Sequence, residues 1–178
     1  MPGRMGSALW EAIWEAGQEF GITPYGTEAM HVLRAEKGYI IVGQDTDGTM
    51  TPDDAGVAWA IGKQKKDFIG KRGLMRPLMS KPDRKQLVGL LTQDAQSVLE
   101  EGAQVTLEAG LTAPYPMVGH VTSSYFSPIL NRSIALAVIK GGRAKMGETV
   151  FIPMPGRDIA ATVVDPVFYD RQGVKING

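Results

Sequence analysis

Apolar residues near the start of the chain recur at the spacing of an amphipathic helix. The segment Ser7–Gly17 predicts such a helix, with Ser7 as its amino-terminal cap and glutamates on its other faces. Its apolar positions are Leu9, Trp10, Ile13 and Trp14. The pattern repeats in Thr27–Lys37, where Thr27 is the predicted cap and Gly38 the predicted stop. We therefore expect two helices joined by a turn-rich connector.

The stretch after Gly38 is less regular. The β-branched run 39–42 and the apolar run 57–61 each predict a short strand, and we assign Trp59 in the second run to the core. Residues 70–79 predict a further helix, which ends before Lys81-Pro82. This half of the chain therefore offers helices but only two strands.

Two strands are too little sheet to cover the apolar faces of these helices. We therefore expect an upstream part of the protein, or a partner, to pack against Trp10 and Trp14. Self-association of the chain is the alternative way of covering the two indoles.

From Arg84 onward, short apolar runs alternate with clusters of Gly, Pro, Asn and Asp. The predicted strands are 85–92, 104–108, 117–125, 134–140, 149–152 and 159–164. Strands at this spacing, with no long helix between them, predict an antiparallel barrel or sandwich. The fold class is therefore α+β, with a boundary near Lys81-Pro82-Asp83.

Composition removes several classes of chemistry. The chain has no cysteine, which excludes disulfide scaffolds, cysteine-ligated zinc, iron–sulfur clusters and thiol nucleophiles. Its 19 Lys and Arg balance its 19 Asp and Glu, so no global positive field favours nucleic acid or an acidic membrane. No apolar run approaches the roughly 20 residues that cross a bilayer. Residues 1–6 lack the apolar stretch of a secretory signal, so we expect a cytoplasmic protein.

Familiar site motifs are not encoded. No phosphate-binding glycine loop or dinucleotide fingerprint occurs, and neither His31 nor His120 has a second metal ligand at a suitable spacing. We expect both histidines to pack or to form hydrogen bonds. The segment Asp45-Thr46-Asp47-Gly48 is similar to a calcium loop, but no Glu occupies the last ligand position, so side-chain turns explain it better.

One ordered series of short motifs is more specific than these. In the first half its members are Arg34-Ala35-Glu36-Lys37-Gly38, Gly43-Gln44-Asp45-Thr46-Asp47, Thr51-Pro52, Gly56, Trp59 and Asp67-Phe68-Ile69-Gly70-Lys71. In the later half they are Val88-Gly89-Leu90, Gly119–Ser123, Ser127-Pro128, Ser133–Ala137, Gly147-Glu148 and Pro166–Tyr169. Over nearly its whole length the chain resembles the glycine cleavage T-protein, or aminomethyltransferase, family. The resemblance implies that residues 1–82 are the carboxyl-terminal part of an α+β folate-binding domain and that 83–178 form an antiparallel β-barrel domain.

Within this family, residues 22–29 and 45–49 are most similar to the alpha subunits of heterotetrameric sarcosine oxidases. Free-standing aminomethyltransferases usually carry Tyr and Leu where this sequence has Val42 and Ala35. The resemblance implies an oxidative demethylation of sarcosine to glycine, with transfer of the one-carbon unit to tetrahydrofolate. FAD, FMN and NAD are then expected only in other parts of the full oxidase, and the partners are the upstream part of the alpha subunit and the other subunits.

The resemblance also assigns cofactor-binding residues. A single carboxylate can accept the two adjacent N–H donors of a pterin ring, and the family gives this role to the residue that is Glu36 here. The alternative is an ion pair of Glu36 with Arg34 or Lys37, or simple solvation. Lys65 aligns with a family cation that meets the anionic folate tail, and Tyr169 is placed at the same cavity. The alternative for Lys65 is a position in a solvated basic loop, and the alternative for Tyr169 is packing within the barrel.

The catalytic Asp of the family comes from its amino-terminal half, and nothing in this chain aligns with it. We therefore expect the isolated chain to be inactive and name no catalytic residue within it. Two other readings stay open: a fragment of a free-standing aminomethyltransferase, and a non-catalytic assembly domain. The upstream sequence distinguishes a free-standing aminomethyltransferase from an oxidase. Folate titration distinguishes a non-catalytic assembly domain from a folate-binding protein.

Overall fold

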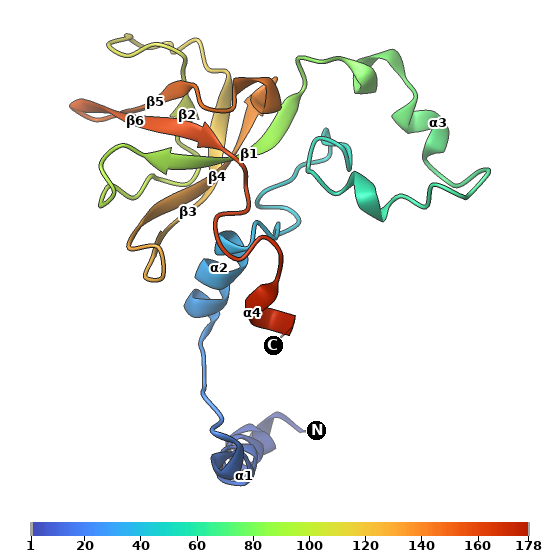
Figure 1. Cartoon of the computed structure of the whole chain (residues 1–178), viewed down its shortest axis with the longest axis vertical. Helices are drawn as coiled ribbons and strands as arrows, with labels where there is room; N and C mark the ends of the chain where they lie inside the picture. Colours follow the sequence, from blue (N-terminus) through green and yellow to red (C-terminus); the bar gives the residue numbers. More distant parts are fainter. Residues whose placement is uncertain (1, 178) are drawn as a thin grey trace. The chain divides into compact units, whose positions relative to one another are not determined.

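The computed structural model describes residues 2–177, and the side chains as far as Lys175. The chain divides into two compact units, Met1–Met30 and His31–Gly178. The boundary falls within helix α2 (Figure 1). Each unit is considered by itself below.

The first unit is helical. A 3₁₀ turn (Gly3–Met5) leads into α1 (Gly6–Gly17), which confirms the predicted helix, and a second 3₁₀ turn (Gln18–Phe20) follows. The prediction that Ser7 caps α1 was wrong, because Met5 occupies the cap position and no side chain caps the helix. No residue of α1 is buried within the described structure. No helix among residues 2–177 has the length and apolar character that spanning a bilayer requires.

Helix α2 (Thr27–Glu36) confirms the second predicted helix. Thr27 is its first residue and not its cap, because the backbone N–H of Met30 donates to the Gly26 carbonyl. At the other end Gly38 adopts a φ of 72°, and the N–H groups of Gly38 and Tyr39 reach back into the helix. Gly38 is therefore the helix stop, as predicted.

The two predicted strands of the first half were wrong. Residues 39–42 form no strand, because the backbone N–H of Ile41 donates to the Asp45 side chain and that of Asp45 returns to Ile41. The 57–61 run is a 3₁₀ turn (Ala58–Ala60), in which Trp59 is 79% exposed and so does not belong to the core. Short apolar runs carry no information about whether a pairing strand is available.

The predicted helix at 70–79 forms only two short pieces. They are α3 (Lys71–Leu74) and a 3₁₀ turn (Pro77–Ser80). Arg76 between them is extended, as is usual for a residue that precedes proline. Pro77 therefore ends the helical segment early.

The second half is a closed antiparallel sheet, and the predicted fold class is confirmed. Its strands are β1 (Lys85–Thr92), β2 (Gln104–Val105), β3 (Gly119–Ser127), β4 (Arg132–Lys140), β5 (Thr149–Met154) and β6 (Arg157–Val164). The strand order is β2-β3-β4-β1-β6-β5 (Figure 1). The outer strands meet where Thr106 and Phe151 exchange both backbone hydrogen bonds, at 2.8 and 2.9 Å. The sheet thus closes into a barrel. A 3₁₀ turn (Gly142–Lys145) and α4 (Val174–Asn177) complete the elements.

Strand β4 explains why this sheet has two buried faces. Ala135, Ala137 and Ile139 point into the barrel core, whereas Leu136 and Val138 join a second cluster with Leu87. That outer cluster is covered by Ile40, Met50 and Phe168. The loop after α2 and the carboxyl-terminal segment therefore pack on the outside of the barrel, where they place the residues of the motif series.

Candidate functional site

Asp45 is a buried carboxylate at the centre of a polar network. It is 1% exposed, and its Oδ2 accepts hydrogen bonds from the Arg34 guanidinium at 2.5 Å and from the Ile41 backbone N–H at 2.8 Å. The sequence places Arg34 near the end of α2 and Asp45 in the following loop. A buried charge needs a charged partner and satisfied hydrogen bonds, and this pair supplies both.

Hydroxyl groups of β3 complete the hydrogen bonds to the Asp45 carboxylate. Thr122 and Ser123 each donate to its Oδ1 at 2.6 Å, and Arg34 donates to the Ser123 hydroxyl at 2.7 Å. Neighbouring strand residues normally point to opposite faces. A register shift between Val121 and Ser123 breaks that alternation, so both hydroxyls reach one oxygen. The bulge therefore ties the loop to the barrel.

The rim of this network is polar and partly exposed. Gln44 donates through its amide to Glu101 at 3.0 Å and to the Thr122 carbonyl at 3.2 Å. The Tyr125 hydroxyl lies 3.2 Å from Glu101, and the Arg34 guanidinium lies 5.6 Å from the centre of the Tyr125 ring. Arg34 is thus fixed both by charge and by a cation–π contact.

Glu36 is buried at the same end of α2. The residue is 2% exposed, and its Oε1 accepts the Ser127 hydroxyl at 2.6 Å. Its backbone carbonyl accepts the N–H groups of both Phe168 and Tyr169 at 2.9 Å. The alternative interpretations of Glu36 were wrong: the side chain is not solvated, and the flanking cations are bound elsewhere.

Those cations bind acidic residues from other segments. Arg34 pairs with Asp45, and Lys37 lies 3.6 Å from the Asp170 carboxylate and also donates to the Asp170 carbonyl. Gly38 lets the carboxyl-terminal segment approach, because a Cβ at this position would lie 2.7 Å from the Pro166 carbonyl oxygen. The end of α2 is therefore enclosed by β3 and by residues 166–170.

A cavity of about 240 Å³ is lined by residues that contact Ser127 and the Glu36 backbone, while Glu36 itself is not among its lining residues. Two of its lining residues hold this site by backbone N–H groups, Leu130 to the Ser127 hydroxyl and Phe168 to the Glu36 carbonyl. Its other walls are Leu91, Arg132, Val164, Asp165 and Val167. The Glu36 carboxylate is buried and does not face bulk water, and the cavity is linked to it only through these backbone contacts.

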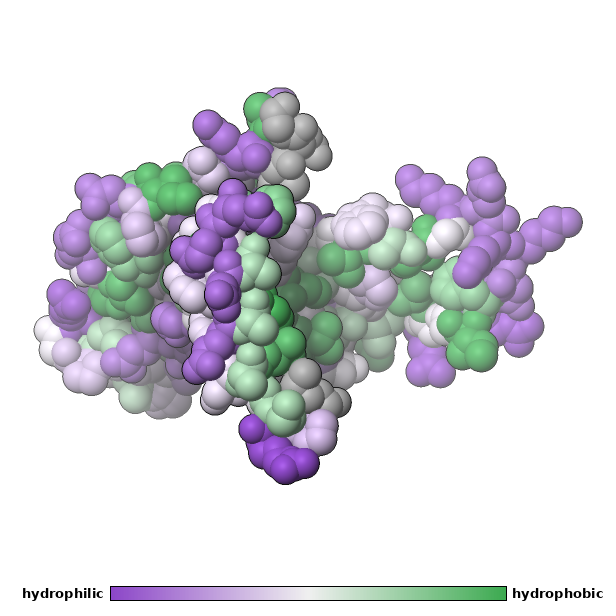
Figure 2. All heavy atoms as spheres, turned by 90° about the horizontal axis from the view of Figure 1, so that it is seen from below, coloured by the Kyte–Doolittle hydropathy of each residue, from purple (hydrophilic) through white to green (hydrophobic). Residues whose placement is uncertain are grey.

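The structure brings two of the three predicted binding residues together. Tyr169 is half-buried, and its backbone is hydrogen-bonded to Glu36. Lys65 is exposed, and its side-chain stem lies near Gly62. No contact found among the described residues joins Lys65 to Glu36. Figure 2 shows many hydrophilic residues over the segment that contains α3, at the right of the view.

A second buried ion pair anchors the loop to the start of β1. Arg84 donates to both carboxylate oxygens of Asp54, at 3.1 and 2.6 Å, and Thr51 donates to the same carboxylate through its backbone and its hydroxyl. Burial raises the pKa of Asp54, but the hydrogen bonds from Arg84 and Thr51 outweigh it and hold the pKa below its ordinary value. Asp54 is therefore charged at neutral pH.

Neither histidine lies in a cluster of metal-ligating side chains among the residues that the structure describes. Within residues 2–177 no group of three or more His, Cys, Asp or Glu side chains could hold a metal ion. Burial lowers the pKa of His120, the nearby Lys85 lowers it further, and Asp47 opposes them. Asp47 instead caps a side-chain turn, accepting the backbone N–H of Thr49 at 2.7 Å, as predicted. His31 lies beside the Tyr125 ring, with 6.3 Å between the ring centres.

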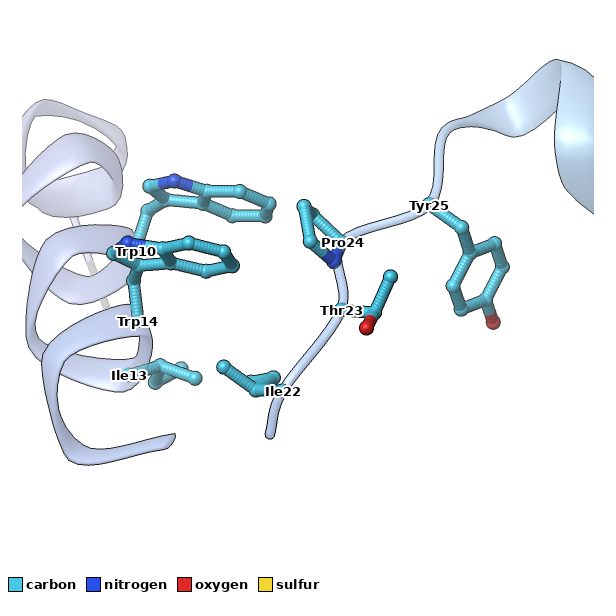
Figure 3. Close-up of a pocket in the computed structure, with 7 residues that line it drawn as sticks. All are labelled: Trp10, Ile13, Trp14, Ile22, Thr23, Pro24 and Tyr25. Atoms are coloured by element: carbon cyan, nitrogen blue, oxygen red, sulfur yellow. The ribbon is translucent and has the colours of Figure 1, made fainter. Parts of the chain in front are cut away.

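The first unit has a separate apolar hollow of about 200 Å³. Figure 3 shows the Trp10 and Trp14 indoles extending from one side of α1 towards Pro24, with Ile13 facing Ile22 and Tyr25 pointing away. Trp10 remains 60% exposed and Trp14 38% exposed. Residues 22–25 therefore cover only part of the apolar face of α1.

The sequence did not reveal Ser127, Ser123 or Thr122 as partners of the site. Ser127 is separated from Glu36 by 91 positions, and the pair meets only because β3 passes the end of α2. The sequence did contain a signal, because hydroxyl residues recur within the predicted strand pattern. The structure shows that all three are buried. Buried hydroxyls need hydrogen-bond partners, which predicts polar contacts on this strand.

Two family models match the chain. The glycine cleavage T-protein C-terminal barrel domain matches residues 85–170, and the GCVT N-terminal domain matches residues 1–65. Glu36 and Asp45 fall within the second match, whereas Thr122, Ser123 and Ser127 fall within the first. The polar network therefore joins the two matched regions.

Individual relatives agree with these matches. A sarcosine oxidase subunit alpha from Corynebacterium sp. (strain P-1) is 49% identical over 100% of this chain, and an aminomethyltransferase from Frankia alni is 38% identical over 90% of it. The crystal structure of glycine cleavage system aminomethyltransferase T from Bartonella henselae covers 80% of the chain with a TM-score of 0.68 and 28% identity. The chain spans only 18%, 42% and 38% of these three proteins, respectively.

Proposed function

We propose, from the premise that this chain belongs to the glycine cleavage T-protein family, that it supplies the carboxyl-terminal part of a tetrahydrofolate site in a larger sarcosine oxidase alpha subunit. The observation that carries the proposal is the buried carboxylate of Glu36, whose backbone and whose partner Ser127 are contacted by two residues that line a cavity. Residues 1–82 are proposed as the end of the folate-binding domain and 83–178 as the barrel domain.

The acceptor atoms of Glu36 fit the donor edge of a pterin ring. Its Oε1 accepts one hydrogen bond, from Ser127, and its Oε2 accepts none from the described residues. A carboxylate offers about four lone-pair sites. Both oxygens therefore keep acceptor capacity for two adjacent N–H donors, which is the pattern on the pterin edge. Tetrahydrofolate, when bound, supplies the nitrogens that receive the one-carbon unit.

Lys65 and Tyr169 are proposed as supporting contacts. The backbone N–H of Tyr169 donates to the carbonyl of Glu36, which supports a contact of this residue with a ligand at the same end of α2. Lys65 is exposed and makes no contact with Glu36 among the described residues, as a cation for a flexible anionic tail would. Attraction between exposed charges is weak and salt-dependent, so we assign Lys65 a smaller share of the affinity than Glu36.

The remaining chemistry is assigned to other parts of the protein. Because the chain spans 18% of its sarcosine oxidase relatives, the catalytic Asp and the FAD, FMN and NAD sites are proposed to lie outside it. The isolated chain is then inactive. The upstream part of the subunit is proposed to cover Trp10 and Trp14, with self-association as the alternative, and the enzyme is proposed to be cytoplasmic.

Sarcosine oxidation is preferred to the free-standing aminomethyltransferase reading. The identity to sarcosine oxidase alpha subunits reaches 49%, against 38% for an aminomethyltransferase. Sequence upstream of this chain tests the choice directly, because flavin and dinucleotide modules belong to the oxidase. A non-catalytic assembly domain would not need a buried carboxylate with free acceptor sites.

Equilibrium titration of the full-length protein with 5-formyltetrahydrofolate tests the proposal. We expect Glu36→Ala to weaken binding by about 100-fold, since it removes a charged acceptor of two hydrogen bonds. The exposed barrel residue Glu100 provides the matched control, and Glu100→Ala is expected to bind like the wild type. Equal affinity of wild type and Glu36→Ala would refute the pterin contact.

A further inference from the structure

We infer that Ser127 is a positioning residue that holds the Glu36 carboxylate ready for its ligand, a role that rests on the proposed pterin contact of Glu36. Ser127 is the last residue of β3 and is 0% exposed. It belongs to the barrel, whereas Glu36 ends α2. The inference thus gives the barrel a part in ligand binding.

The direction of the hydrogen bond is set by the backbone. The N–H of Leu130 donates to the Ser127 Oγ at 3.1 Å and so occupies one of its lone pairs. The hydroxyl hydrogen is left to point at Glu36 Oε1, which lies 2.6 Å away. The result is a directed chain from Leu130 through Ser127 to the carboxylate.

Ser127 acts on the one part of Glu36 that is otherwise free. Helix α2 and the N–H groups of Phe168 and Tyr169 fix the backbone of Glu36. They leave the rotatable bonds of its side chain undetermined. The Ser127 hydrogen bond is the only one that the described residues make to this carboxylate. It therefore selects one orientation of the carboxylate, in which Oε2 accepts no hydrogen bond from the described residues.

Strand β3 offers a matched control for this role. Ser124 is also a buried serine of β3, and its hydroxyl accepts the backbone N–H of Leu99 at 3.0 Å. Ser124→Ala and Ser127→Ala each remove one buried hydroxyl and leave one backbone N–H without its acceptor. Only Ser127→Ala removes a contact to Glu36, so a purely structural cost appears in both variants.

Titration of the full-length protein with 5-formyltetrahydrofolate tests the inference. We expect Ser127→Ala to weaken binding about tenfold and Ser124→Ala less than about twofold. In a Glu36→Ala background, adding Ser127→Ala is expected to change the affinity less than about twofold, because the group it positions is gone. Ser127→Cys keeps the shape of the side chain with a bulkier atom that is only a weak donor, and it is expected to weaken binding as Ser127→Ala does if the alanine variant does not fold.

Three results would overturn the inference. Ser127→Ala and Ser127→Cys could bind no more weakly than Ser124→Ala, or Ser127→Ala could lose the same factor with and without Glu36. Either result removes the positioning role while the Glu36 contact stands. If Glu36→Ala itself binds like the wild type, the positioning role and the proposed function fall together.

Discussion

The Asp45 carboxylate lies 2.5 Å from the Arg34 guanidinium, and the Asp45 side chain is fully enclosed. Removing one member of a buried pair leaves the other charged and unpaired. We therefore expect Asp45→Ala to lower the free energy of unfolding by about 3–5 kcal/mol, measured by urea denaturation. It also frees the Thr122 and Ser123 hydroxyls, which adds to the loss.

An exposed pair provides the comparison for this prediction. Lys145 and Glu148 lie 3.6 Å apart, with the glutamate side chain 54% exposed. Lys145→Ala is expected to cost less than about 1 kcal/mol, as exposed pairs usually do. Similar losses for Lys145→Ala and Asp45→Ala would contradict the central place of the buried network.

The Asp54–Arg84 pair predicts a pH-dependent difference in stability. Because the folded-state pKa of Asp54 is below its unfolded value, the stabilisation is complete above that unfolded value, about 3.9, and is lost as the pH falls through the folded pKa. Asp54→Asn should cost about 2 kcal/mol at neutral pH. The difference from wild type should shrink below about pH 4. A cost that stays constant down to pH 2 would argue against this ion pair.

His120 predicts that the stability of the protein changes with pH in a milder range. Its folded-state pKa is lowered by burial and by Lys85, so the unfolded chain binds a proton more readily, starting near its ordinary pKa of about 6.5. Its contribution to stability is present above that pH and is lost as the pH falls towards the folded pKa. His120→Gln should flatten the decline in thermal stability between pH 7 and the lower pKa, and Lys85→Met should reduce it. Identical slopes in wild type and His120→Gln would disprove the assignment.

Gly38 is predicted to tolerate no side chain. Gly38→Ala meets both a left-handed backbone, with a φ of 72°, and the Pro166 carbonyl 2.7 Å from the new Cβ. Gly56→Ala has a similar φ of 74° and nothing within 4 Å. We expect losses of about 1 kcal/mol for Gly56→Ala and roughly 2–4 kcal/mol for Gly38→Ala, measured by chemical denaturation. Equal losses would mean that backbone strain alone matters at Gly38.

The barrel strands were predictable because their burial follows the sequence closely. Strand β4 is a nearly continuous apolar run, and almost all of it is buried. The runs at 39–42 and 57–61 looked similar but differ in their surroundings. Ile40 packs on the outer barrel cluster while Val42 is 84% exposed, so the run is a docked loop. Such docking depends on residues distant in sequence, which a local pattern does not contain.

The site was predictable only in part for the same reason. Glu36 was identified through the motif series, and its burial agrees with a functional carboxylate. Its partner Ser127 was not identified, because a serine before a proline is also an ordinary strand end. The roles of Glu36, Lys65 and Tyr169 in binding stay predictions. Contacts across the α2–β3 junction arise from topology and not from spacing along the chain.

A structure of the full-length protein with 5-formyltetrahydrofolate would test the central claim most directly. We predict that the pterin ring lies against the end of α2, with two of its N–H donors roughly 2.7–3.2 Å from the Glu36 carboxylate oxygens. The Ser127 hydroxyl should remain hydrogen-bonded to Oε1. A pterin ring bound elsewhere, with the Glu36 carboxylate contacting only Ser127, would contradict the account.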